Sequence, residues 1–236
     1  MTARTEQTVV LDIEGTTSSA RHVHEVLFPY ARQRLAGWLE AHLSETRVHA
    51  LLDEVARAAG SGSLDIRTAV RLLEQWSDED RKEAPLKTLQ GLIWAEGYAR
   101  GELTGHVYSD TVDALDLWNG RGVPVHVYSS GSVLAQKQWF AHTPYGDLRG
   151  RLGHHFDTVN AGPKTAVKSY RTITEMLSVP ATGILFASDS PAELEAAATA
   201  GWRTALVRRA GGTAPEAPGA RRIHGDLLSV ARGGTG

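Results

Sequence analysis

TVVLDIEGTT, residues 8–17, is a short β-branched and apolar run that Asp12, Gly15 and two threonines close abruptly. This pattern is typical of a buried parallel strand that ends in a loop. Parallel α/β sheets place their ligands at the carboxyl ends of the strands. The polar residues that follow this run are therefore the first candidates for a functional site.

Downstream of about Val107, strand and helix patterns alternate along the chain. The expected strands read VPVHVYSS (123–130), GILFASD (183–189) and TALVRR (204–209), and the expected helices cover 111–119, 133–141, 165–177 and 192–200, with a last amphipathic stretch near Leu227. Such alternation is the signature of a doubly wound, Rossmann-like parallel sheet, so the predicted fold class is α/β with the first strand in the same sheet. The Gly/Pro-rich segment 211–219 is expected to be an exposed loop.

Between Ser19 and about Gly105 the sequence has helical periodicity and almost no strand signal. Apolar residues recur at intervals of three or four in three successive stretches, and a fourth such stretch opens at Leu89. We therefore expect an all-helical cap domain at residues 19–105, inserted after the first strand of a core formed by residues 1–18 and 106–236.

Composition excludes several classes of function. The 236 residues contain 25 Lys+Arg and 27 Asp+Glu, so no net field favours nucleic acid or an anionic membrane as a partner. The absence of cysteine excludes a disulfide framework, a thiolate metal site and a cysteine nucleophile. Together with an amino terminus that lacks the apolar core of a signal peptide, this composition fits a cytoplasmic protein.

Polar residues gather at three expected strand ends. Residues 12–17, 129–132 and 188–190 occupy these ends, and Gly162-Pro163-Lys164 lies in a loop between the last two. Two carboxylates, a cluster of hydroxyls at a helix start and a lysine can be assembled into a phosphoryl-transfer site.

Asp12 is the candidate nucleophile, attacking phosphorus to give an aspartyl phosphate. On this motif alone, an N-cap or Asx-turn aspartate is an equal alternative. Glu14, two residues on, can reach the same face of the loop and serve as acid and base, or it can be an exposed turn glutamate. Asp189 would complete an all-oxygen Mg²⁺ site with Asp12.

The remaining candidates concern the phosphate. Residues 129–132 offer hydroxyl and backbone donors at a helix start, although an N-cap role explains Ser132 equally well. Lys164 or Lys168 supplies a positive charge, and the other is a solvated helix lysine. Glu193 stands in Ser190-Pro191-Ala192-Glu193, a capping-box pattern, and is therefore expected to be structural.

The order of these motifs resembles the four motifs of the haloacid dehalogenase superfamily of phosphohydrolases. In that superfamily the second acid is usually aspartate; DIEGTT, with Glu14, resembles one branch, the enolase-phosphatases of methionine salvage, also called acireductone synthases. DRKEAPLKTLQGLIWAEGYARGELTGHVYSD (80–110), VLFPYA (26–31), SSGSVLAQK (129–137) and GPK (162–164) are similar to the same family. The resemblance covers the chain to about Arg208, although the fourth motif reads SDSPAEL (188–194), where the family more often has apolar residues after Asp189.

The resemblance implies a Mg²⁺-dependent enzyme that enolises 2,3-diketo-5-methylthiopentyl-1-phosphate and then dephosphorylates it to 1,2-dihydroxy-3-keto-5-methylthiopentene. Its implied site consists of Asp12 as nucleophile and metal ligand, Glu14 as acid/base and ligand through its backbone carbonyl, Asp189 as metal ligand, and Ser129, Ser130 and Lys164 as phosphate-binding residues. The expected partner is this small phosphorylated diketone, and the chain is expected to act as a monomer.

Three alternatives stay open at this point: a phosphatase of the same superfamily with another substrate, a dehalogenase in which Asp12 attacks carbon without a metal, and a receiver-like module that only stores a phosphoryl group. Receiver modules usually carry the acceptor aspartate on a middle strand of their sequence and have no helical cap, which argues against the last.

Overall fold

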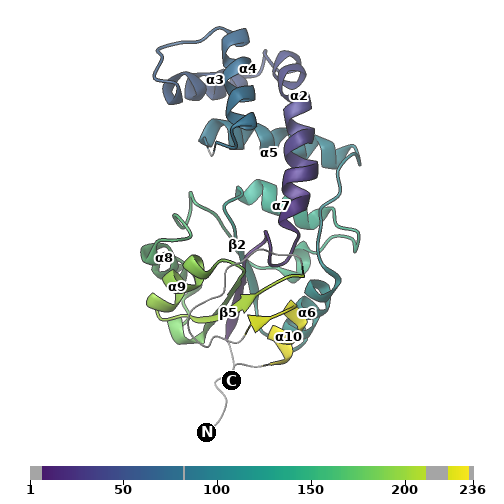
Figure 1. Ribbon diagram of the computed structural model, residues 1–236, viewed down its shortest axis with the longest axis vertical. Coiled ribbons are helices and arrows are strands. Elements are labelled where there is room, and N and C mark those ends of the chain that lie inside the picture. The colour runs from purple at the N-terminus through teal and green to yellow at the C-terminus, as the bar shows by residue number, and fades with distance from the viewer. Residues whose placement is uncertain (1–6, 82, 211–222, 234–236) are drawn as a thin grey trace. The chain divides into compact units, whose positions relative to one another are not determined.

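The computed structural model describes residues 7–81, 83–210 and 223–233, so the expected loop at 211–219 lies outside the described residues (Figure 1). The chain divides into two compact units, one formed by Met1–Ala20 with Gly105–Gly236 and the other by Arg21–Thr104. Within the described residues, no helix is both long and apolar enough to cross a membrane.

The first unit is built on a parallel sheet. Its strands, counted over the described residues, are β1 (Thr8–Leu11), β2 (Val125–Tyr128), β3 (His155–Phe156), β4 (Ile184–Ser188), β5 (Arg203–Val207) and β6 (Ile223–His224). They are ordered β3-β2-β1-β4-β5-β6, and every neighbouring pair is parallel. The predicted doubly wound α/β fold is thus confirmed. The sequence did not predict β3 and β6, because two residues are too few to show a period of two.

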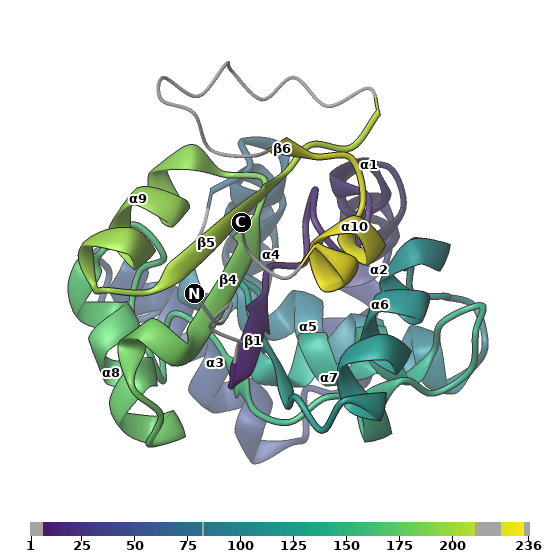
Figure 2. The ribbon, with the colours of Figure 1, turned by 90° about the horizontal axis from the view of Figure 1, so that it is seen from below.

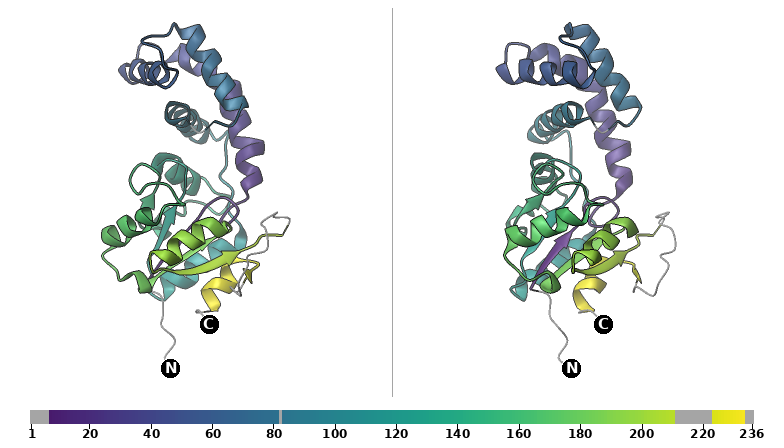
Figure 3. Two further views of the ribbon diagram at one scale, coloured as in Figure 1. Left: turned by 60° about the vertical axis from the view of Figure 1, so that its left-hand side comes forward. Right: turned by 90° about the vertical axis from the view of Figure 1, so that its left-hand side faces the viewer.

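Helices lie on both faces of this sheet. They are α6 (Ser109–Gly120), α7 (Val133–Ala141), α8 (Val167–Leu177), α9 (Pro191–Thr199) and α10 (Leu227–Arg232). Figures 2 and 3 show α8 and α9 together on one face and α6 with α10 on the other. The sheet is therefore covered on both faces, which is why its central strands are uniformly buried.

The second unit consists of helices in the described residues: α1 (Ala20–His22) at its entry, α2 (Phe28–Ala41), α3 (Thr46–Ala58), α4 (Ile66–Asp78) and α5 (Ala84–Ala99). The last four correspond to the four predicted helical stretches. A π-helical turn, Val23–Leu27, precedes α2 and was not predicted. The carbonyl of Leu27 in this turn accepts a hydrogen bond from Nε1 of Trp94 at 2.8 Å, so a buried indole satisfies a backbone group in the irregular turn.

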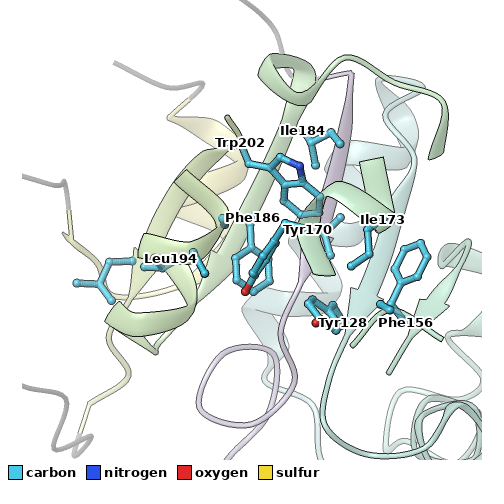
Figure 4. Close-up of a cluster of buried hydrophobic side chains, with 13 residues drawn as sticks. Tyr128, Phe156, Tyr170, Ile173, Ile184, Phe186, Leu194 and Trp202 are labelled. Carbon is cyan, nitrogen blue, oxygen red and sulfur yellow. The ribbon is translucent and has the colours of Figure 1, made fainter. Parts of the chain in front are cut away.

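Aromatic side chains fill the core between the sheet and the α8–α9 face (Figure 4). Tyr170 makes edge-to-face contacts with Tyr128, Phe186 and Trp202, at centroid distances of 5.1–5.6 Å. Geometry of this kind adds a favourable electrostatic contribution to the burial of apolar surface. The hydroxyl groups of the two tyrosines donate hydrogen bonds to backbone carbonyls of the loop before α8. Tyr128 donates to Gly162 at 2.7 Å and Tyr170 to Lys164 at 2.6 Å.

A buried histidine makes the stability of the first unit dependent on pH. His126 on β2 is 6% exposed, and its Nδ1 accepts the backbone N–H of His154 at 2.8 Å. Burial, with a smaller contribution from His154 and His155, lowers the pKa of His126 to about 4. His155 lies on β3, and burial, with smaller contributions from Lys137 and His154, lowers its pKa to about 4 as well.

Because both folded-state pKa values lie below that of an unfolded histidine, near 6.5, the native state binds fewer protons than the unfolded chain between these limits. Stability is therefore fully present above about pH 6.5 and falls as the pH drops toward 4, by at most about 3 kcal/mol for each histidine. We expect His126→Asn, which keeps an acceptor but does not titrate, to remove about half of this slope in thermal unfolding midpoints measured from pH 4.5 to 7.5. His49→Asn, at an exposed position on α3, is the control, and an unchanged slope in His126→Asn would contradict the assignment.

Candidate active site

The carboxyl ends of the central strands bring the predicted site residues together. β1 lies between β2 and β4, so Asp12 after β1 has Ser129 after β2 on one side and Asp189 after β4 on the other. Lys164 arrives from the loop before α8. Four segments that are far apart in the sequence thus meet at one edge of the sheet, as the doubly wound topology dictates.

Asp12 is the centre of this arrangement. Only 4% exposed, it follows β1 and donates its backbone N–H to the carbonyl of Ala187 on β4 at 3.0 Å. Its Oδ1 lies 2.5 Å from Nζ of Lys164, and its Oδ2 accepts from Thr16 Oγ1 at 3.3 Å and Ser188 Oγ at 3.5 Å. Side chains from three segments therefore aim the carboxylate, and none of these contacts is a helix cap.

Lys164 is a buried cation between two acids. Its side chain is 9% exposed, and its Nζ lies 2.5 Å from Asp12 and 2.8 Å from Oε2 of Glu193. Burial alone would lower the pKa of Lys164, but the two carboxylates outweigh it, and the pKa is raised above its ordinary value. Lys164 therefore carries its charge at any pH in which the protein works. Lys168, the second residue of α8, is exposed.

Glu193 belongs to this cluster, and its interpretation as a capping-box residue is wrong. Ser190, the N-cap of α9, makes no side-chain cap hydrogen bond. Instead Glu193 pairs with Lys164 and accepts a hydrogen bond from Ser188 Oγ at 2.9 Å. Burial first, and then the charge of Asp12, raise the pKa of Glu193 to about 7. A sequence signal was available, since a side chain in the first turn of a helix leans back toward the preceding strand end.

The carboxyl group of Asp189 lies close to the backbone of Gly15. Gly15 has φ of +74°, a left-handed conformation, and a Cβ at this position would overlap the carboxyl group of Asp189. Burial first, and then the charges of Asp12 and Glu14, raise the pKa of Asp189 to about 6. Glu14 directly precedes Gly15 and forms an isolated bridge with Ser18.

The serines of the loop after β2 have different environments. Ser129 is buried, and its Oγ accepts the backbone N–H of Gly131 at 3.3 Å, while Ser130 is exposed. Ser132 is the N-cap of α7 and accepts from the N–H of Ala135 at 3.2 Å. The N-cap alternative therefore holds for Ser132. Asp157, which the sequence analysis did not single out, accepts the N–H of Val133 at 3.0 Å and so braces the same helix start.

The oxygen donors at this edge fit a hard divalent cation. In the described part of the chain, no three His, Cys, Asp or Glu side chains stand together as a metal site. Asp12 and Asp189 supply two carboxylates at this edge of the sheet, and the backbone carbonyl of Glu14 as a further ligand stays a prediction of the sequence analysis. Burial contributes most to the raised pKa of Asp189, and such a cation would relieve the smaller contribution, the repulsion from Asp12 and Glu14. Mg²⁺ takes oxygen ligands of this kind and keeps several waters.

Comparison with known proteins adds three kinds of similarity. A family model described as haloacid dehalogenase-like hydrolase matches residues 6–201. The chain is 50% identical to an Enolase-phosphatase E1 of Streptomyces avermitilis over 86% of this chain and 85% of that protein, and 46% identical to one of Pseudomonas aeruginosa over 89% and 84%. The crystal structure of the UTR4 protein of Saccharomyces cerevisiae matches with a TM-score of 0.79 at 30% identity, covering 94% of this chain and 98% of that one.

The close approach of Gly15 and Asp189 predicts that Gly15→Ala destroys activity. The added methyl group must displace the Asp189 carboxyl group, in addition to a backbone strain of about 1–2 kcal/mol. Gly122→Ala is a matched control, because Gly122 has φ of +71° with open space around its Cβ position. In thermal unfolding both variants should lose the stability that the backbone strain costs, and Gly15→Ala should lose more because of the displaced carboxyl group, but only Gly15→Ala should lose phosphatase turnover. Equal activity in the two variants would refute the steric argument.

Proposed function

From the premise that the chain belongs to the enolase-phosphatase E1 family of haloacid dehalogenase-like hydrolases, we propose that it converts 2,3-diketo-5-methylthiopentyl-1-phosphate into 1,2-dihydroxy-3-keto-5-methylthiopentene and inorganic phosphate in methionine salvage. The observation that carries the proposal is the buried Asp12 carboxylate at the end of β1, held against the Lys164 ammonium at 2.5 Å. A carboxylate removed from water and aimed by three side chains is suited to attack phosphorus.

In the phosphoryl-transfer step, an oxygen of Asp12 attacks phosphorus and the bond between phosphorus and the C1 oxygen breaks. Glu14 donates a proton to the leaving oxygen. Water then attacks the aspartyl phosphate, the phosphorus–Asp12 bond breaks, and Glu14 takes the proton of the water, which returns both residues to their starting states. Enolisation of the diketone precedes this step and transfers no phosphoryl group.

Lys164, Ser129 and Ser130 bind the phosphate oxygens in this proposal. Lys164 already lies within hydrogen-bond distance of the attacking carboxylate, so a phosphoryl group on Asp12 places its oxygens within reach of the same ammonium. Asp12, Asp189 and the backbone carbonyl of Glu14 would hold Mg²⁺, which supplies charge neutralisation for the transferring phosphoryl group when bound. The ion pair between Glu193 and Lys164, at 2.8 Å, supports a role for Glu193 in holding the lysine.

The rest of the chain fits this role. The core, residues 1–18 and 106–236, carries the proposed chemistry, and the helices of residues 19–105 serve as its cap domain. The absence of cysteine suits an enzyme of a reducing cytoplasm. In this proposal the chain acts as a monomer on a small phosphorylated diketone.

The two lysines of the 164–168 segment provide one test. Lys164→Ala removes the charge that would face the phosphate and leaves Asp12 and Glu193 without their cation, so kcat/KM for phosphate release should fall by ~10²-fold or more. Lys168→Ala changes an exposed position and should stay within about twofold of wild type. Steady-state phosphate release measures both variants. A larger loss in Lys168→Ala would mean that the wrong lysine has been assigned.

The separation of the two reaction steps provides the main test. Wild-type enzyme supplied with the diketo-phosphate and Mg²⁺ should give enol absorbance and inorganic phosphate together. Asp12→Asn lacks the nucleophile, so it should release no phosphate, yet it should still exchange the C1 hydrogen with D₂O or accumulate the enol-phosphate. Hydrogen exchange is followed by NMR and phosphate by a colorimetric assay.

The control for Asp12→Asn is metal binding, because asparagine is a weaker ligand than aspartate; Mg²⁺ affinity is therefore titrated in the same variant. A variant that binds metal and substrate but shows neither exchange nor enol would place Asp12 in the enolisation step as well. Wild-type enzyme that turns over other phosphate esters but not the diketo-phosphate would exclude the proposed substrate. Release of halide from a haloacid without Mg²⁺ would favour a dehalogenase.

A further inference from the structure

Arg209 is a buried arginine directed at the loop that carries the nucleophile. It stands two residues after β5, and its side chain is only 9% exposed. Nε and Nη2 both donate to the carbonyl of Thr16, at 2.9 and 2.5 Å. Its third nitrogen, Nη1, lies 2.7 Å from Oδ1 of Asp110, and its guanidinium carbon lies 4.1 Å from the ring centre of Tyr108. Each part of the guanidinium group is thus engaged.

Thr16 connects this arginine to both acids of the site. It is fully buried, and its carbonyl is the group that Arg209 holds. Its Oγ1 donates to Oδ2 of Asp12 at 3.3 Å and accepts the backbone N–H of Asp189 at 3.0 Å. A shift of the Thr16 backbone would therefore move a hydrogen-bond partner of Asp12 and a hydrogen-bond partner of Asp189 at once.

The arginine is itself fixed, so it can act as an anchor. Asp110, near the start of α6, pairs with Arg209 through Oδ1 and accepts the backbone N–H of Leu227 through Oδ2 at 2.8 Å. The face of the Tyr108 ring covers the guanidinium plane. A planar fork with several donors can satisfy one carbonyl twice and a carboxylate once, whereas the single ammonium of lysine cannot reproduce that geometry.

We propose that Arg209 is a positioning residue for phosphoryl transfer, holding the Thr16 carbonyl so that the Asp12 carboxylate stays aimed at the phosphorus. This inference rests on the proposed phosphatase function and names a residue that acts through Thr16 rather than on the substrate. Because misplacement of a reacting group by ~1 Å can cost ~10²-fold in rate, loss of this anchor is expected to appear in kcat rather than in KM.

The experiment compares Arg209→Met and Arg209→Lys with Arg121→Met. Arg121 is a matched control, because its guanidinium donates to a backbone carbonyl, that of Ala231 at 2.7 Å, away from the nucleophile loop. Phosphate release is measured with p-nitrophenyl phosphate and with the diketo-phosphate at saturating Mg²⁺. Both Arg209 variants should lose ~10–10²-fold in kcat with KM changed by less than about threefold, while Arg121→Met keeps the wild-type kcat.

A double-mutant cycle separates positioning from a general loss of stability. Thr16→Val removes the hydroxyl that contacts Asp12, and if Arg209 acts through Thr16, the combined loss in Arg209→Lys/Thr16→Val should be smaller than the product of the single losses. Multiplicative losses, a change confined to KM, or a kcat in the Arg209 variants equal to that of Arg121→Met would each overturn the inference. If Arg209→Met does not fold, Arg209→Lys decides by the same criteria. Failure of wild-type enzyme to release phosphate from either ester would instead reject the proposed function.

Discussion

The buried ammonium of Lys164 is the constraint on which the site depends. Taking such a charge out of water costs several kcal/mol, and only closely placed opposite charges offset that cost. Asp12 comes from the end of β1 and Glu193 from the first turn of α9, so the pair of carboxylates exists only because β1 and β4 are neighbours in the sheet. The charge balance of the site therefore depends on the strand order of the first unit. A change in that order would leave the buried Lys164 ammonium without its two carboxylates.

The aromatic core extends this requirement into the loop that carries the lysine. Tyr128 and Tyr170 pack edge to face beneath the loop and donate their hydroxyls to the carbonyls of Gly162 and Lys164. Burial raises the pKa of Tyr128 to about 12 and that of Tyr170 further, so both remain neutral donors across the range in which an enzyme works. The backbone of the lysine is thus held by the core, and its side chain by the acids. Such support from packed residues keeps a reacting group in place more firmly than a loop can alone.

Sequence reasoning found the parts whose signal is local. The β-branched run before Asp12, the serines after β2 and the aspartate after β4 each stand where a strand pattern breaks, and the resemblance that their order suggested was confirmed by the comparisons. Sequence reasoning failed where a local capping pattern competes with a tertiary ion pair, and where the contacting residues are far apart in the sequence. Ser190 to Glu193 has the residues of a capping box, but pairing with a buried ammonium is the stronger attraction for that carboxylate. Arg209 contacts a carbonyl 193 residues earlier, and no spacing rule predicts such a contact.

Carboxylates outnumber ammonium groups at the site, and this excess of negative charge bears on how a phosphate and a cation would bind there. Asp12, Glu14, Asp189 and Glu193 interact electrostatically around a single buried ammonium, and like charge contributes, after burial, to raising the pKa of Asp189 to about 6 and of Glu193 to about 7. An arriving phosphate group would add further negative charge to a site already rich in carboxylates. In the proposed reaction, positive charge that arrives with the phosphate would offset this repulsion, and Asp12 and Asp189 would accept that charge in the form of a divalent cation. The same excess of carboxylates that repels a lone phosphate would thus couple binding of the phosphate to binding of the metal.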